Sequence, residues 1–229
     1  MSITTTTLTR AAGVAAVAAG LLFILIQLIH PHEDVATVTT TAWAFTALLT
    51  MAMSVLLLVG LTGLYLRQVT ETGVLGLVGF LLFGACFMLT IAATFVEVFV
   101  LPPLADQAPQ YVDDFLATFT GGAVTGDVGS LPVAGLVSAV GYLLGGLLFG
   151  VALFRARILA RWAALLLAVG SVATLLVPLL PHSLDRLLAF PVGLALAGLG
   201  YSLWREQRRS SHVSVSSVPS ARLDSAGVE

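Results

Sequence analysis

Residues 11–29 read AAGVAAVAAGLLFILIQLI, an unbroken run without a charged side chain. A transmembrane α-helix needs about 20 such residues to cross the hydrocarbon core of a bilayer. Five more apolar stretches follow, and none alternates apolar with polar residues as a barrel strand would. The predicted spans are residues 11–29, 42–66, 74–100, 132–154, 159–180 and 187–204. The sequence therefore predicts an all-α, polytopic transmembrane bundle of six helices.

The composition agrees with lipid as the surrounding solvent. Hydrophobic residues make up 58% of the 229 residues, charged residues only 10%, and the mean hydropathy is +1.03. A soluble domain of this size needs a larger charged surface. The net charge of −2 argues against nucleic acid as a partner. Cys86 is the one cysteine, which excludes an intrachain disulfide. Membrane lipid is the expected partner.

Arginine indicates the orientation of the chain. If all six spans cross, one side carries Arg10, Arg67, Arg155, Arg157, Arg161, Arg205, Arg208 and Arg209. Only Arg186 lies on the other side. Because cytoplasmic loops carry the excess of basic residues, both termini are predicted in the cytoplasm. Lysine and asparagine, which have AT-rich codons, are absent, and this absence indicates a GC-rich bacterial genome. We therefore expect a multi-pass protein of the bacterial cytoplasmic membrane.

The longest loop, residues 101–131, is predicted to face outward. Within it, APQYVDDFLATF (residues 108–119) places five apolar or aromatic residues on one helical stripe, with Asp113 and Asp114 mostly on the other side. This pattern predicts a short amphipathic helix on the outer membrane surface or over the mouth of the bundle. A loop that merely connects two spans is the other interpretation. Residues 1–204 would form the transmembrane domain, and the serine-rich residues 205–229 a disordered cytoplasmic tail.

Glycines in the fourth predicted span indicate close helix packing. Small residues four apart let helix backbones approach in lipid. The glycines concerned are Gly141, Gly145, Gly146 and Gly150. They could pair two copies of the chain into an oligomer. The third and fourth spans also share a G-x-L-L-F-G pattern, at Gly79 and Gly145, which favours antiparallel packing of these two spans.

A polar cluster, LIHPHED at residues 28–34, follows the first span. Pro31 disfavours helix at the preceding residue, so the span should end at His30, at the outer interface. His182 ends the fifth span at the same level. The candidate metal ligands are His30, His32, Glu33 and His182, which suit a divalent metal. A single haem between His30 and His182 is another interpretation. Alternatively, these residues only end hydrophobic spans where water begins.

Glu97 is an acidic residue inside the apolar run TFVEVFV, residues 94–100. Ionisable residues within spans are costly and mark either a functional site or a pairing partner. Thr90 and Thr94 precede Glu97 at helical offsets, so the three share one face. Arg186 is the only predicted external base, and a Glu97–Arg186 ion pair would join the third span to the sixth. Alternatively, Glu97 binds a cation or a proton.

Prolines near the outer ends of the last two spans predict an outward cavity. Pro178 and Pro191 are expected to kink the fifth and sixth spans there. Four hydroxyl-bearing residues could line such a cavity, although isolated hydroxyls in membrane helices often bond to their own backbone. They are Ser138, Tyr142, Ser171 and Thr174.

Several stretches together resemble an uncharacterised family of six-span bacterial integral membrane proteins with no assigned activity. They are RAAGVAAVAAGLLFILIQLIHP (10–31), GLTGLYLRQVTETGVLGLVGFLLF (60–83), LLFGVALFRARILARWAALLLAVG (147–170) and LLVPLLPH (175–182). The resemblance implies the six-span architecture and a bacterial source, and it carries over no functional residue.

Motifs of membrane enzymes are missing from the sequence. It has no H-E-x-x-H, no serine–histidine nucleophile pair and no aspartate pair within a span. We therefore expect a non-enzymatic accessory or sensory component. A small-solute or ion transporter or channel that uses Glu97 is the alternative, and a metal- or haem-dependent membrane enzyme is the third interpretation.

Overall fold

The computed structural model describes residues 4–179 and 186–216, without the side chains of 177–179 and 209–216. In this part the chain forms helices and no strand, which confirms the all-α prediction. The elements are α1 (Thr5–Ile29), α2 (Thr41–Leu66), α3 (Val69–Phe99), α4 (Leu101–Leu104), α5 (Pro109–Thr120), α6 (Leu131–Ala156), α7 (Arg161–Ala173), the 3₁₀ helices η1 (Thr174–Leu179) and η2 (Arg186–Ala189), and α9 (Phe190–Ser216).

Five segments are long and apolar enough to cross a membrane: α1, α2, α3, α6, and η2 with the first part of α9. The fifth predicted span is shorter, because α7 ends at Ala173 and the chain continues as η1. The sequence gives a reason for this change. In a continuous α-helix, a proline at position 178 could not donate a hydrogen bond to residue 174, and its ring would clash with the carbonyl of that residue. An α-helix therefore cannot continue unchanged to the predicted end of the span.

Local sequence determines where the first two long helices begin and end. Thr4 and Thr40 are the N-caps of α1 and α2, and their hydroxyls accept hydrogen bonds from the N–H groups of Thr7 and Trp43, each at 3.2 Å. At the other end of α1, His30 is extended, as expected before a proline. The predicted end of the first span is confirmed.

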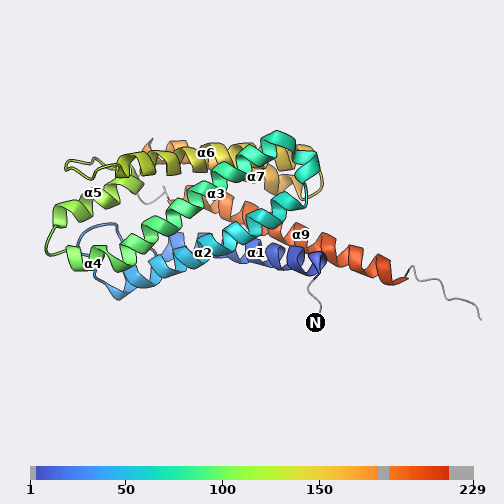
Figure 1. Cartoon of the computed structure of the whole chain (residues 1–229), viewed down its shortest axis with the longest axis horizontal. Coiled ribbons are helices and arrows are strands. Elements are labelled where there is room, and N and C mark those ends of the chain that lie inside the picture. The colour runs from blue at the N-terminus through green and yellow to red at the C-terminus, as the bar shows by residue number, and fades with distance from the viewer. Residues whose placement is uncertain (1–3, 180–185, 217–229) are drawn as a thin grey trace, which may run out of the picture.

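The five long segments and α7 together form a closed ring of helices (Figure 1). Each packs on the next along the chain, and α9 returns to pack on α1. Glycines bring these two helices close together. A Cβ at Gly13 would lie 2.9 Å from the carbonyl oxygen of Gly200, and a Cβ at Gly200 would lie 2.6 Å from the carbonyl oxygen of Gly13. Only glycine permits this approach.

The α3–α6 pair packs through its two G-x-L-L-F-G motifs. A Cβ at Gly79 would strike the backbone of Phe149, and a Cβ at Gly145 would strike the backbone of Phe83. The expected antiparallel packing of these spans is therefore confirmed. The glycines expected to pair two copies, Gly141, Gly145, Gly146 and Gly150, are buried within one chain and face α3 and α7 instead. Their small size is used for intrachain packing.

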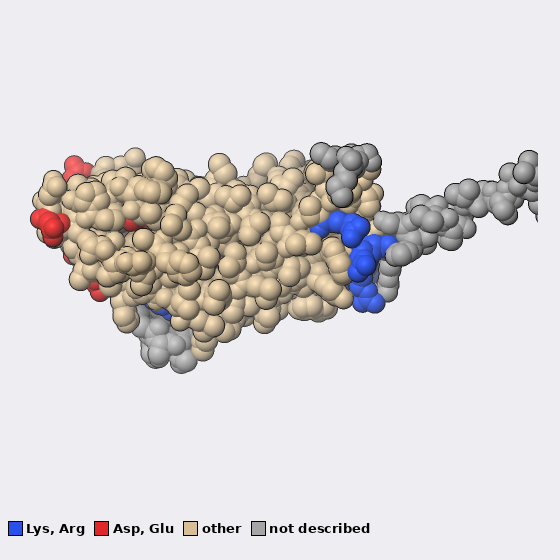
Figure 2. All heavy atoms as spheres, turned by 90° about the horizontal axis from the view of Figure 1, so that it is seen from below, with Lys and Arg blue, Asp and Glu red and all other residues tan. Residues whose placement is uncertain are grey.

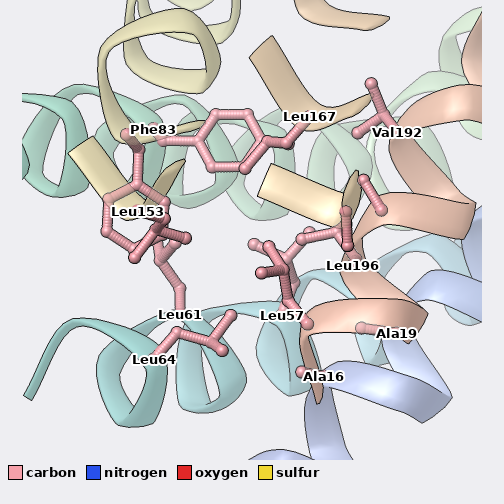
Figure 3. Packing of buried hydrophobic residues seen from close by; sticks show 14 of the residues in the cluster. Ala16, Ala19, Leu57, Leu61, Leu64, Phe83, Leu153, Leu167, Val192 and Leu196 are labelled. Carbon is pink, nitrogen blue, oxygen red and sulfur yellow. The ribbon is translucent and has the colours of Figure 1, made fainter. Parts of the chain in front are cut away.

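The centre of the ring is filled by apolar side chains from all six segments (Figure 3). The cluster includes Leu57 and Leu61 of α2, Phe83 of α3, Leu167 of α7 and Leu196 of α9. Each of these side chains is at most 2% exposed. We call this packed region the central core.

Charged residues separate to the two ends of the bundle, as Figure 2 shows. Arginines gather where α9 leaves the bundle, and acidic residues gather at the opposite end. We call these the basic end and the acidic end. Between them, large apolar side chains such as Leu21, Phe45 and Leu136 are more than half exposed. An apolar belt of this kind requires lipid around it. The chain is a multi-pass membrane protein.

At the acidic end, α4 and α5 pack against the loop between α1 and α2. Val112, Phe115 and Leu116 of α5 are buried against Leu101 and Ala105. The apolar side of α5 therefore contacts the protein itself. α5 therefore covers the end of the bundle. This is one of the two positions expected for the amphipathic helix, the other being the membrane surface.

Asp114 of α5 is buried, although it was expected on the polar side of this helix. Its carboxylate accepts hydrogen bonds from the backbone N–H of Thr125 at 2.8 Å and of Gly126 at 3.0 Å, and from the side chain of Gln110 at 3.2 Å. The N–H of Thr125 is the main reason that the pKa of Asp114 lies below its usual range. Asp114 thereby holds the loop after α5 against that helix.

The predicted disordered tail begins too early. α9 continues past Trp204 to Ser216, so residues 205–216 are helical, and residues 217–229 lie outside the described part. Arginine, glutamate and glutamine are good helix formers and allow the helix to extend into water. Near the basic end, Glu206 of α9 also forms an ion pair with Arg67 at the end of α2.

Candidate functional site: a cavity at the acidic end

The candidate site is a cavity of about 880 Å³. It lies between α1, α2, α3 and α6, with residues of α5, η1 and η2 completing its wall. The α-helical part of α7 ends at Ala173, so the ring lacks a full helix on this side toward the acidic end. An outward cavity was expected near Pro178 and Pro191, and Ser138, Tyr142 and Thr174 do line the cavity. Ser171 instead donates to the carbonyl of Leu167 within α7.

Apolar side chains form the deep part of the cavity. Phe23, Met53 and Phe87 lie seven to twelve residues inward from His30, Thr41 and Phe99, at the acidic ends of their helices; at about 1.5 Å per residue this is a depth of about 10–18 Å. The central core fills the ring toward the basic end. In this structure the cavity is therefore a cup closed on its inner side.

Three polar side chains on the wall have no hydrogen-bond partner among the described residues: Gln27 of α1, Glu97 of α3 and Tyr142 of α6. Polar groups inside a protein are nearly always paired, and an unpaired one calls for water or a ligand. The three groups come from three different helices. Their convergence on one cavity gives it an amide, a carboxyl group and a phenol for contacts with a bound molecule.

The threonines of the wall behave differently. Thr90 donates its hydroxyl hydrogen to the carbonyl of Cys86 at 3.1 Å, and Thr94 donates to the carbonyl of Thr90 at 2.7 Å. Thr50 does the same within α2, to Thr46. These bonds use the hydroxyl hydrogens within the helices. The threonines therefore offer the cavity oxygen acceptors and no further donors.

Arg186 links the start of the last span to the end of the first. Its guanidinium donates to the carbonyl of His30 at 2.5 Å and to the carbonyl of Pro31 at 3.2 Å. A cation at this position also suits the negative end of the α1 dipole. No ion pair joins Arg186 to Glu97 among the described residues. The expected link between the third and sixth spans is thus a link between the first and the sixth.

Trp43 connects His30 and Glu97 behind the cavity wall. Its indole N–H donates to the backbone carbonyl of Glu97 at 3.2 Å, and its ring meets the His30 imidazole edge-on at a centroid distance of 5.4 Å. Trp43 is almost completely buried. It therefore fixes the position of α3 at Glu97 relative to the ends of α1 and α2.

The structure brings most of the predicted site residues to this cavity. His30, Glu33, Glu97, Arg186, Thr90 and Thr94 all line it. His32 is exposed and does not line it, and His182 lies outside the described residues. His30 and Glu33 are 4.0 Å apart, and in the described part no three His, Cys, Asp or Glu residues are placed to hold a metal ion. The metal hypothesis, which includes His182, and the haem hypothesis, which needs it, stay predictions.

Sequence reasoning missed Gln27. It is the only side chain in residues 11–29 with an amide, and this isolation within an apolar run was the available signal.

Comparisons with protein-family models, curated proteins and solved structures find no match to this chain.

Proposed function

We propose that this is a six-span protein of the bacterial cytoplasmic membrane that binds a small amphipathic molecule from outside, as a non-enzymatic sensory or accessory component. The cavity with three unpartnered polar groups above a closed core carries this proposal. A cup of this kind can hold a molecule with an apolar body and a polar head.

The separation of charge supports the orientation. The positive-inside rule assigns the basic end to the cytoplasm, and with it the start of α1 and the extension of α9. The acidic end and the mouth of the cavity then face outward. α5, which covers part of this end, is the predicted outer-loop helix.

Geometry supports six crossings. Arg161 begins α7 in the arginine-bearing loop after α6, and Arg186 contacts the opposite end of the bundle at His30. The 13 residues of α7 span about 20 Å, and the six residues of η1 about 12 Å. Their sum is close to the roughly 30 Å of a hydrocarbon core. A mixed α and 3₁₀ segment thus serves as the fifth span.

A transporter is the second candidate, because Glu97 is an ionisable residue near the acidic end of a span. Transport also requires a path to the basic end. The central core, with Leu57, Phe83 and Leu196 each at most 2% exposed, fills that path in this structure. The cup shape therefore favours binding over transport.

Thiol labelling tests whether the cavity opens to the outside. In a Cys86→Ser background, the Gln27→Cys variant places the only thiol on the cavity wall, and a Leu25→Cys variant places it on the exposed apolar surface of the same helix. A cationic, membrane-impermeant methanethiosulfonate is added to intact spheroplasts. We expect rapid labelling of the first variant and little of the second, because thiols react as thiolates in water.

Two results would contradict the proposal. If the Gln27→Cys variant reacted only in inverted vesicles, the orientation would be reversed. If it reacted no faster than the Leu25→Cys variant on either side, no water-filled cup would exist at this position.

A further inference from the structure

We infer that the cavity selects an amphipathic organic cation, with the carboxylate of Glu97 as its anchor. This inference rests on the proposed function and adds the chemical class of the ligand. It follows from the charge on the wall, the aromatic lining and the arrangement of donors and acceptors.

The charged groups on the described wall favour a cation. Two carboxyl groups, those of Glu33 and Glu97, line the wall against one guanidinium, that of Arg186. The two groups differ in position, because Glu33 is exposed at the mouth and Glu97 is half-buried. A cation entering from outside would meet Glu33 first and Glu97 deeper in the cavity.

Arg186 is poorly placed to bind an anion. Its guanidinium donates to the carbonyls of His30 and Pro31, which act as its counter-charge at the end of α1. An anionic ligand would have to compete with these bonds while lying beside two carboxyl groups. The repulsion between like charges at close range disfavours that arrangement.

The hydrogen-bonding groups of the wall also favour a cation. The threonine hydroxyl hydrogens are already bonded within the helices, so the wall offers mainly acceptors: the Glu97 carboxylate, the threonine oxygens and the Gln27 carbonyl. Donors on the wall include the amide of Gln27, the phenol of Tyr142 and the hydroxyl of Ser138, while the guanidinium of Arg186 is bonded to the end of α1. A sugar or another polyol needs many donors and acceptors together, whereas an ammonium group needs acceptors.

Aromatic side chains provide the surface for the apolar part of such a ligand. Phe23, Phe87, Phe119 and Tyr142 line the cavity, and the rings of Phe87 and Tyr142 lie 6.4 Å apart between centroids. Aromatic faces attract cations and bury apolar groups at the same time. A weakly hydrated organic cation loses less on leaving water than a metal ion, so it suits a partly apolar cup.

Two ions of equal shape and opposite charge test the inference. Binding of radiolabelled tetraphenylphosphonium to the detergent-purified full chain is measured by equilibrium dialysis, with unlabelled tetraphenylphosphonium or tetraphenylborate as competitor. We expect saturable binding, competition by the cation and no competition by the anion. Equal competition by tetraphenylborate would show that the cavity selects apolar bulk, and it would overturn the inference.

Variants test the role of Glu97. Glu97→Gln should weaken tetraphenylphosphonium binding by about tenfold or more, because removing one partner of a charge pair in a desolvated site is costly. Glu71→Gln, a carboxylate change near the basic end of the same helix, is the matched control and should bind like the original protein. Unchanged binding by Glu97→Gln would overturn the inference.

A second variant covers the case in which Glu97→Gln does not fold, as judged by gel filtration. Glu33→Gln at the exposed mouth should weaken binding by about two- to threefold, as expected for a more solvated charge, and no change would count against the inference. Labelling of the Gln27→Cys variant tests the proposed function independently of ligand binding. If that thiol is labelled from outside and tetraphenylphosphonium does not bind, the outward-facing cavity is supported and the inferred preference for a cation is wrong.

Discussion

The two halves of the helix ring use the same segments for opposite purposes. Toward the basic end, glycines let the helices touch, and large apolar side chains such as Leu61 and Phe83 fill the centre. Toward the acidic end, the same helices enclose a cavity and direct Gln27 and Glu97 into it. We call these the closed half and the open half.

The difference between the halves has two physical causes. One is the length of α7, whose α-helical part ends at Ala173 and leaves the open half without a sixth full helix. The other is side-chain chemistry. Gly145 lets α6 touch the backbone of α3 in the closed half, whereas Ser138 and Tyr142 face the cavity on the same helix. A few residues per helix thus determine which part of a bundle is solid.

The largest expected effect is in the closed half. A methyl group at Gly145 would strike the backbone of Phe83, which cannot rotate away, so Gly145→Ala should cost at least the about 1–3 kcal/mol typical of overpacking. Gly84→Ala is the matched control, because a Cβ there meets only Leu61 and Leu58 at 3.8 and 3.9 Å. Thermal unfolding in detergent measures both. Equal melting temperatures would show that the closed half tolerates separation of its helices.

A smaller effect is expected at the rim of the open half. Arg186→Gln removes two charge-assisted hydrogen bonds to the end of α1 and should lower the free energy of unfolding by about 1.5 kcal/mol. Arg186→Lys should lose less than the glutamine variant because it keeps the charge near the helix end. It should still lose some stability, because an ammonium lacks the planar fork of donors. A greater loss in the lysine variant would contradict this account. Thermal unfolding of the three proteins gives the comparison.

The smallest effect is expected at Asp114 of α5, which covers the end of the open half, and this effect depends on pH. Hydrogen bonds, led by the one from Thr125, lower the pKa of Asp114 in the folded protein. Its stabilising contribution is therefore complete above the ordinary aspartate pKa of about 3.9 and is lost as the pH falls through the lower folded value. Asp114→Asn should flatten this part of the stability–pH curve, measured by thermal unfolding between neutral and acidic pH.

The neighbouring Asp113 supplies the control for that experiment. It is exposed and lies on the same helix, so Asp113→Asn should leave the acid part of the curve as it is. If both variants flattened the curve equally, general surface charge and not the Asp114 bonds would be responsible.

The fold was predictable where one chemical rule acts alone. Long uncharged runs give helices, and Pro31 ends α1 where the sequence indicates. The antiparallel contact of Gly79 and Gly145 motifs also followed from their positions in adjacent spans. The boundary between α7 and η1 was harder to predict, because the apolar character of the sequence continues through Thr174 while the backbone geometry changes.

Most members of the candidate site were predictable, although Gln27 was missed and His32 does not line the cavity, whereas the pairings were not predictable. The sequence placed His30, Glu97 and Arg186 at one level of the bundle, and all three line the cavity. The sequence could not show that the guanidinium of Arg186 would reach the carbonyls at the end of α1. Every residue has a backbone carbonyl, so the sequence does not indicate which one accepts a hydrogen bond. The burial of Asp114 was missed for the same reason, since its partners include backbone N–H groups of a later loop.

The closure of the ring by α9 on α1 has a consequence for biosynthesis. Gly13 and Gly20 of α1 pack on Gly200 and Gly193, which leave the ribosome only after nearly all the other described helices have been made. During insertion, the glycine face of α1 is therefore exposed to lipid until α9 has been made. Such contacts between distant parts of a chain form late and slow assembly. A nascent chain stopped before α9 would expose that face to other helices in the membrane.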